Sequence, residues 1–470
     1  MRTAVPERIS NLTPWVGLLL AFAVFLVWFR SGTDPALSLR LPGSDFPPGA
    51  EKSATNAVLL GKLLPGSGKP AASIDGAWPQ FRGQKRDGLS TETVRLSRNW
   101  NAGPPKELWS VDLGEGYAGA AVASGRVYLT DYDQAHRQDA IRCLSLADGQ
   151  EIWRFAYPVN LKRNHGMSRS VPAVSGKFLV TIGPKCHVAC LDAETGELQW
   201  GLDMVRQFGA TVPPWYTGQC PLVEKGKVIL APGGKGALLA AVDLATGKTI
   251  WQTPNPRQWK MTHSSVMPMM LAGRETFVYC ANQGVVGVSA DDGKLLWETT
   301  AWKISLATVP SPLVVDDRRI FLSGGYDAGS MMIEVSNDGG VFSAKPVFKL
   351  DPKIFGATQH TPILQNNSIL GVRPDGQFVA LDLSGKVTAT SGAGSGFGLG
   401  NFLVVTDGVA FAMNDNGKLS LVEIGSGKIA IVSQAQVLHG HESWGPLALA
   451  GGRLLARDFT RMVCLDVAEK

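Results

Sequence analysis

Beyond residue 77, short apolar runs alternate with glycine-containing turns at a regular interval. One unit has an apolar run at 171–174, a second at 177–182, a third that ends in a tight turn, and a fourth that contains a tryptophan. The clearest copies of the last two runs are CLSLADGQEIW (143–153), CLDAETGELQW (190–200), AVDLATGKTIW (241–251) and GVSADDGKLLW (287–297). Glycine supplies the positive φ of such turns at little cost. Each unit therefore predicts four short strands.

The repeat continues to the C-terminus. The turn glycines lie 42 to 51 residues apart, and they are Gly149, Gly196, Gly247, Gly293, Gly339, Gly385 and Gly427. A last copy at 464–467 makes eight units. Four strands about every 46 residues is the period of a β-propeller blade, and the units lack the helical periodicity of tetratricopeptide or ankyrin arrays.

The two ends of the repeat region complement each other. The last unit stops at Asp466-Val467, before its fourth strand, while the run ELWSVDL at 107–113, with Trp109, precedes the first unit unassigned. If this run paired with the last unit, the ring would close without an open sheet edge. The sequence thus predicts an all-β, eight-bladed β-propeller of four-stranded blades over residues 77–470, with an N-terminal strand that closes the last blade.

The first 76 residues follow a different pattern. Residues 12–29 are uncharged and apolar apart from Thr13, and their length is close to the roughly 20 residues that cross a bilayer. Arg2 and Arg8 favour a cytoplasmic N-terminus at 1–11 and an exported propeller. We expect a single-pass transmembrane signal-anchor helix in the inner (cytoplasmic) membrane with the propeller in the periplasm; a cleaved signal peptide is the alternative. Residues 30–76 are rich in Pro, Gly and Ser, which is typical of a linker.

Composition agrees with a turn-rich β protein. Gly occurs 54 times and charged residues make up 18% of the chain, against about 25% in ordinary soluble domains. The 45 Lys and Arg and 40 Asp and Glu give a net charge of only +5. This balance excludes a strongly basic nucleic-acid-binding protein.

Two motifs resemble those of a known family. The segment 241–251 fully meets the pattern Ala-x-Asp-x-x-Thr-Gly-Lys-x-x-Trp, and WPQFRGQKRDG at 78–88 opens the repeat region. Both resemble the bacterial PQQ-binding-like β-propeller repeat family, of quinoprotein type, over about residues 77–470. The resemblance implies that Trp153, Trp200, Trp251 and Trp297 dock structurally against neighbouring blades. It does not imply one activity, because the repeat serves quinone-dependent dehydrogenases as well as the assembly lipoprotein BamB.

The loops that enter the innermost strand of each blade converge at one mouth of a propeller. In these loops histidines, aromatic residues and charged residues gather, and the candidates for ligand binding are Tyr117, His165, Arg169, Tyr216, His263, His360, His441, Glu442 and Trp444. They predict a pocket for a small molecule or a peptide. The alternative is that these polar groups only satisfy loop backbone. The spacing of His439, His441 and Glu442 is too weak a signal to predict a metal site.

Markers of catalysis are missing from the sequence. The resemblance implies a vicinal cysteine pair beside a quinone, but the six cysteines are scattered, and they are Cys143, Cys186, Cys190, Cys220, Cys280 and Cys464. No haem-type Cys-x-x-Cys-His occurs, and no calcium-binding carboxylate set or catalytic residue can be assigned. We expect the cysteines to be small buried hydrophobic residues. We predict no cofactor, with PQQ and Ca²⁺ as the alternative.

Three functions stay open at this point. The first is a membrane-anchored, exported, non-catalytic propeller that binds a protein, peptide or envelope polymer, and not nucleic acid. The second is a PQQ-dependent alcohol or sugar dehydrogenase. The third is an outer-membrane assembly role like that of BamB, from which this chain differs by lacking a lipid-attachment cysteine near its N-terminus.

Overall fold

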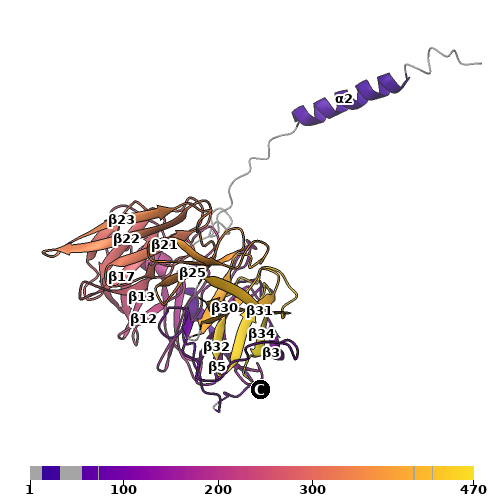
Figure 1. Cartoon of the computed structure of the whole chain (residues 1–470). Coiled ribbons are helices and arrows are strands. Elements are labelled where there is room, and N and C mark those ends of the chain that lie inside the picture. The colour runs from indigo at the N-terminus through magenta and orange to yellow at the C-terminus, as the bar shows by residue number, and fades with distance from the viewer. Residues whose placement is uncertain (1–12, 32–54, 72, 406–407, 426, 470) are drawn as a thin grey trace, which may run out of the picture.

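The computed structural model describes residues 13–31, 55–71, 73–405, 408–425 and 427–469. Its repeat region is an all-β, eight-bladed propeller, as predicted. We number the blades 1 to 8 in chain order of their inner strands. Colour follows the chain from blade to blade in Figure 1, and the first and last blades meet where β4 contacts β32.

Blades 1 to 4 are antiparallel sheets whose strands follow chain order from the innermost outward. Blade 1 has β4 (Ala121–Ala123), β5 (Arg126–Asp133), β6 (Gln138–Ser145) and β7 (Glu151–Pro158); blade 2 has β8 (Ala173–Ser175), β9 (Phe178–Ile182), β10 (His187–Asp192) and β11 (Leu198–Asp203). Blade 3 has β12 (Leu222–Glu224), β13 (Lys227–Leu230), β14 (Ala240–Asp243) and β15 (Thr249–Gln252); blade 4 has β16 (Met267–Leu271), β17 (Arg274–Ala281), β18 (Gly284–Ser289) and β19 (Leu295–Thr299). A short helix, α3 (Met204–Phe208), follows blade 2.

Blades 5 to 8 repeat this order, except that the last blade has only three strands of its own. Blade 5 has β20 (Leu313–Val314), β21 (Arg319–Gly324), β22 (Gly329–Asp338) and β23 (Val341–Leu350); blade 6 has β24 (Ile363–Gln365), β25 (Ser368–Val372), β26 (Phe378–Leu381) and β27 (Val387–Thr390). Blade 7 has β28 (Asn401–Val405), β29 (Val409–Met413), β30 (Lys418–Gly425) and β31 (Lys428–Gln436); blade 8 has β32 (Ala448–Ala450), β33 (Arg453–Arg457) and β34 (Arg461–Asp466).

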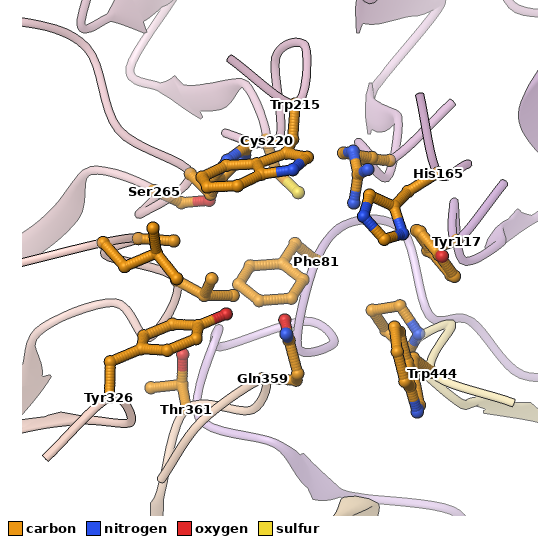
Figure 2. A pocket seen from close by; sticks show the side chains of 17 residues that line it. Phe81, Tyr117, His165, Trp215, Cys220, Ser265, Tyr326, Gln359, Thr361 and Trp444 are labelled. Atoms are coloured by element: carbon orange, nitrogen blue, oxygen red, sulfur yellow. The ribbon is translucent and has the colours of Figure 1, made fainter. Parts of the chain in front are cut away.

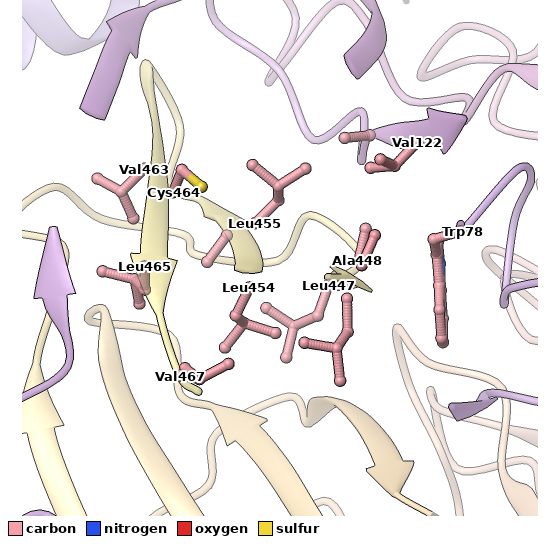
Figure 3. Close-up of a cluster of buried hydrophobic side chains, with 14 of the residues drawn as sticks. Trp78, Val122, Leu447, Ala448, Leu454, Leu455, Val463, Cys464, Leu465 and Val467 are labelled. Atoms are coloured by element: carbon pink, nitrogen blue, oxygen red, sulfur yellow. The ribbon is translucent and has the colours of Figure 1, made fainter. Parts of the chain in front are cut away.

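The predicted closing strand is present. Strand β3 (Lys106–Asp112) pairs antiparallel with β34, and Trp109 lies opposite Cys464. An apolar core continues across the junction between blade 8 and blade 1, as Figure 3 shows for Trp78, Val122, Leu447, Ala448, Leu454, Leu455, Val463, Cys464, Leu465 and Val467. The ring is therefore closed by a strand that precedes blade 1 in the sequence and completes blade 8.

Tryptophan docking joins neighbouring blades in the first half of the ring. The indole N–H groups of Trp109, Trp153, Trp200 and Trp251 donate to the turn carbonyls of Leu146, Glu194, Leu244 and Ala290 at 3.0, 3.1, 2.8 and 3.3 Å. Each indole also covers the turn glycine of the next blade: a Cβ at Gly247 would lie 2.7 Å from Cδ2 of Trp200. The sequence did not single out Trp109 for this role.

The docking series changes after the fourth blade. Trp297 is buried, but its indole N–H has no partner among the described residues, and the ring lies over Gly287 of its own blade. Trp297 packs in an apolar cluster with Ile320 and Val335 of blade 5, but it does not dock on a turn glycine, because the β22–β23 hairpin extends ten residues per strand and carries its turn glycines away. Between blades 5 and 6, Phe348 takes the place of an indole against Gly385.

The ordered chain begins ahead of residue 77. Within the segment predicted as a linker, a 3₁₀-helix (Ala57–Leu60) packs the buried Val58 against Gly201, and β1 (Lys62–Pro65) pairs antiparallel with β7 as a fifth strand of blade 1. The Pro- and Gly-rich composition of residues 30–76 concealed this short strand, although the apolar run AVLLGKLL at 57–64 was a signal for it.

The predicted membrane span does not gain support from the structure. Helix α2 (Thr13–Ser31) covers most of it. In the part of the chain that the structure describes, no helix combines the length and the apolar character that crossing a bilayer requires. The expectations for residues 1–11 and for residues 32–54 lie outside the described residues.

Asp139 is a buried carboxyl group between blades 1 and 2. Its Oδ2 accepts a hydrogen bond from the hydroxyl of Tyr157, while its Oδ1 has no partner among the described residues. Burial raises the pKa of Asp139 to about 7. Since a free Asp titrates near 3.9, the folded state holds this proton over a pH range in which the unfolded chain has released it.

The contribution of tryptophan docking at Gly247 to stability can be measured separately from the strain that any side chain causes at a positive φ. Gly247 and Gly226, both in blade 3, have φ of 69° and 74°, but only Gly247 faces an indole. Gly226→Ala should cost about 1–2 kcal/mol of unfolding free energy for the left-handed conformation. Gly247→Ala should cost about 1–3 kcal/mol more, because its Cβ overlaps Trp200. Urea unfolding measures both, and equal losses would contradict the docking role.

Asp139 should make stability depend on pH. Because its folded pKa is raised, unfolding free energy should fall as pH rises from about 4 to about 7. Asp139→Asn should remove this decline and stabilise the protein at pH 8 by about 1–3 kcal/mol, with no gain at pH 4. The exposed Asp338→Asn is the control and should leave the profile unchanged. If the unfolding free energies of Asp139→Asn and of the unaltered chain changed in parallel with pH, the prediction would be wrong.

Candidate functional site

The loops that enter the inner strands surround a cavity of about 320 Å³ on the propeller axis. Figure 2 shows side chains from many blades converging on it. Of the nine predicted ligand-binding candidates, five line this cavity, and they are Tyr117, His165, Arg169, His263 and Trp444. These residues lie ahead of the inner strands of blades 1, 2, 4 and 8.

The segment 78–90 forms the floor of the cavity. It starts beside blade 1, where Trp78 bridges to Val122, and ends beside blade 7, where β2 (Leu89–Ser90) pairs in parallel with β28. Between these two points, Phe81 turns its ring into the cavity (Figure 2). The segment thus crosses the propeller axis, and the cavity is blind at this end.

Two arginines hold the floor segment in place. Arg82, at φ 64°, donates to the carbonyls of Thr361 (2.7 Å) and Pro362 (2.9 Å) in blade 6 and to two carbonyls of its own loop. Arg86 donates to Glu224 Oε2 in blade 3 at 3.0 Å. Burial lowers the pKa of Arg82 to about 10, so its guanidinium stays charged at neutral pH. The opening motif at 78–88 therefore has a structural role.

One wall of the cavity is a stack of Tyr117 and Trp444, whose ring centroids are 5.2 Å apart. The Tyr117 hydroxyl donates to Glu442 Oε2 at 2.9 Å. Burial and this carboxylate raise the pKa of Tyr117 well above its ordinary value. Glu442 therefore supports the wall from behind and does not line the cavity.

Arg169 is the fixed positive charge of the cavity. Its guanidinium carbon lies 4.8 Å from the centre of the Tyr117 ring, an ordinary cation–π distance. Its Nε is buried and has no hydrogen-bond partner among the described residues, none of which forms an ion pair with it. Burial lowers the pKa of Arg169 to about 10, so it is charged at neutral pH.

His263 adds no charge at neutral pH. Burial, and then the nearby Arg169, lower its pKa to about 3. The ring lies against Gly218, where a Cβ would come within 2.5 Å of Nδ1. His263 is therefore a neutral, closely packed side of the cavity.

The other four predicted candidates do not line the cavity. Tyr216 is buried and donates to the Lys162 carbonyl at 2.7 Å. His360 donates from Nδ1 to the Leu399 carbonyl (2.9 Å), since its Nε2 accepts from the Val372 N–H (3.1 Å). His441 is exposed beside Phe459, and Glu442 lies behind Tyr117. Tyr216 and His360 thus satisfy loop backbone, as the alternative interpretation held.

Several lining residues were not among the candidates, and they include Phe81, Trp215, Cys220, Ser265, Leu306, Val309, Tyr326, Gln359 and Thr361. The loop positions of Trp215 and Gln359 were a signal for them. One repeat position, two residues ahead of an inner strand, is occupied by Cys220, Ser265 and Thr361. This shared position was a signal that these side chains line the cavity. Tyr326 lies in the turn between β21 and β22. Because successive strands of a blade run in opposite directions, this turn lies on the same face as the loop that enters the inner strand.

The cavity does not fit PQQ with Ca²⁺. That quinone has three carboxylates, whereas Arg169 is the one Lys or Arg side chain among the lining residues. The lining includes no Asp or Glu to hold a calcium ion, and the described residues contain no group of three or more metal ligands. Cys220 lines the cavity as a free thiol, and burial raises its pKa to about 11.

All six cysteines are free and buried, which confirms their expected role as small hydrophobic residues. Cys143, Cys190 and Cys464 lie opposite Trp153, Trp200 and Trp109 on the neighbouring strand. Burial raises the pKa of each of these three thiols to about 12. They are therefore unreactive packing partners of the docking tryptophans.

Known proteins share this architecture. Residues 136–391 match the family described as "Outer membrane protein assembly factor BamB". BamB of Yersinia pestis is 22% identical over 264 residues, which are 52% of this chain and 60% of that protein, so the match spans less than two thirds of the relative.

Solved structures agree in fold. BamB from Moraxella catarrhalis superposes with a TM-score of 0.52 at 15% identity, over 77% of this chain and all of that one. A quinohemoprotein alcohol dehydrogenase from Comamonas testosteroni gives a TM-score of 0.54 at 13% identity, over 84% of this chain and 81% of that one. At these identities, the likeness concerns the fold alone.

The floor segment should depend on Arg82. Arg82→Met leaves carbonyl groups of blade 6 without their donors and should cost about 2–4 kcal/mol of unfolding free energy. The matched control is Lys85→Met, which alters an exposed side chain of the same segment and should cost less than about 0.5 kcal/mol. Urea unfolding measures both. If the two variants were equally stable, Arg82 would not hold the floor.

Proposed function

Because this chain belongs to the BamB family of outer membrane protein assembly factors, we propose that it is a non-catalytic binding propeller whose partner is a protein or peptide of the bacterial envelope. The partner engages the face on which the inner-strand loops meet. The family and its Yersinia pestis member are both described as outer membrane protein assembly factors, which supports a protein partner.

The observation that carries this proposal is the chemistry of the axial cavity. It offers aromatic surface, one unpaired cation and neutral polar groups, which suit binding and orientation. Its lining has no Asp or Glu, since Glu442 lies behind Tyr117, and its His263 is neutral at physiological pH because burial lowers the pKa of that ring to about 3. A site of this kind holds a ligand without converting it.

The location of the propeller is part of the proposal. We place it on the exported side of the inner membrane, attached through the N-terminal segment that includes α2. Exposed apolar side chains along α2, such as Trp15, Leu18 and Leu19, support an attachment role. Carbonate extraction of membranes tests it: the full chain should stay in the pellet, while a chain lacking residues 1–31 should be released, and release of both would refute the attachment.

Site-specific photo-crosslinking tests the binding face. A photoreactive residue at Gln359 lies at the cavity, whereas one at Thr246 lies in an exposed β14–β15 turn at the opposite ends of the strands. In living cells, Gln359 should yield discrete protein adducts that mass spectrometry assigns to outer-membrane assembly components, and Thr246 should yield none. Adducts of equal yield at both positions would contradict a specific binding face.

A second measurement tests the absence of catalysis. The purified full chain, incubated with PQQ and Ca²⁺, should show no dye-linked oxidation of alcohols or sugars above that of PQQ alone. Oxidation that depends on the chain would overturn the non-catalytic proposal and favour a quinoprotein dehydrogenase.

A further inference from the structure

The size of the axial cavity limits what it can hold. Its volume of about 320 Å³ is near the lower end of small-molecule sites, which span roughly 300–1,000 Å³. The floor segment closes one end, so a ligand enters from the loop face, where His165 and Tyr326 are exposed. A small molecule or the end of a peptide fits this space, and a folded chain does not.

The charge of the cavity restricts the ligand further. Arg169 has a buried Nε without a hydrogen-bond partner in the described part of the chain. The side chain of Arg169 is half-buried at the cavity, where a charge without a counter-ion is costly and an anion would relieve that cost. Glu442, whose negative charge acts on Arg169, accepts a hydrogen bond from the Tyr117 hydroxyl and does not line the cavity. One fixed positive charge matches one negative charge on the ligand.

The walls select the body of the ligand. Flat apolar surfaces come from Phe81, Tyr117, Trp215 and Trp444. The hydroxyls of Ser265 and Thr361 already accept hydrogen bonds from backbone N–H groups at 2.9 Å. The remaining polar side chains of the lining are His165, Tyr326 and Gln359, and an aromatic ring would find stacking surface on several sides.

We propose that the axial cavity binds a single carboxylate attached to a flat aromatic group, and that Arg169 is the residue that selects the carboxylate. This inference rests on the binding function proposed above and names its ligand class. The carboxylate pairs with the guanidinium in a charge-assisted hydrogen bond, and the ring stacks within the aromatic walls. A free aromatic acid and the carboxyl end of a peptide with a terminal aromatic residue share this chemistry.

Calorimetric titration of the detergent-solubilised full chain tests the proposal. Indole-3-acetate represents the free acid, and indole-3-acetamide is its neutral control of nearly equal shape. The tripeptide Ala-Ala-Trp, with a free or an amidated carboxyl group, represents the peptide end. In at least one of the two pairs, the acid should bind about 10- to 100-fold more tightly than the amide, since that is the usual gain from a charged hydrogen bond.

Variants of one loop assign the effect to Arg169. Arg169→Met should remove the preference for the acid, so that acid and amide bind with equal, weak affinity, while Arg169→Lys should keep part of it. The matched control is Arg163→Met: Arg163 lies in the same loop but is exposed and pairs with Glu115 at 2.7 Å, so its loss should leave both affinities within about twofold of the unaltered chain.

The titrations and the crosslinking together decide separately on the ligand class and on the proposed function. Equal affinity for acid and amide in the unaltered chain, or binding of neither, overturns the inference, even if Arg169→Met fails to fold. If the probes do not bind but Gln359 still captures assembly components, the ligand class is wrong and the proposed function stands. If the acid binds selectively but no partner is captured, the ligand class stands and the proposed function is wrong.

Discussion

The pairing of β3 with β34 is the contact on which the other features of this protein depend. Blade 8 has three strands of its own, and its outer edge would be open without the chain from ahead of blade 1. Closure places the loop of Tyr117 beside the loop of Trp444, although more than 300 residues separate them. The stack of these two rings, and the cavity beside it, exist only because the ring is closed.

The chain that precedes blade 1 also forms the floor of the cavity. Residues 78–90 cross the propeller axis and are bound to blades on opposite sides of it by Arg82 and Arg86. A hydrogen-bonded arginine can satisfy several carbonyl groups that no other side chain would reach. An axial channel thereby becomes a blind cavity with Phe81 at its base, which explains a motif whose function the sequence alone left open.

Charge in the cavity is arranged unevenly. Glu442 could neutralise Arg169, yet its carboxylate is bonded to Tyr117, and Arg169 lies against the face of that same ring. His263 stays neutral because burial and Arg169 both oppose its protonation. The result is one positive charge among aromatic walls. This arrangement suits recognition of an anion, and it lacks the several cations and carboxylates that a quinone with calcium would require.

The sequence alone determined the period, the eight blades and the closing strand, since turn glycines and alternating apolar runs are local to each unit. It also grouped Tyr117, His165, Arg169, His263 and Trp444, because equivalent loops of a ring meet at one mouth. Only the tertiary structure decided which loop side chains face the axis: His360 and Tyr216 hold equivalent positions but turn to carbonyl groups that the folded neighbours present. The positions of Trp297 over Gly287 and of Phe81 in the cavity were likewise decided by the tertiary structure. The contacts of a side chain depend on packing between segments that are distant in sequence, which no local pattern describes.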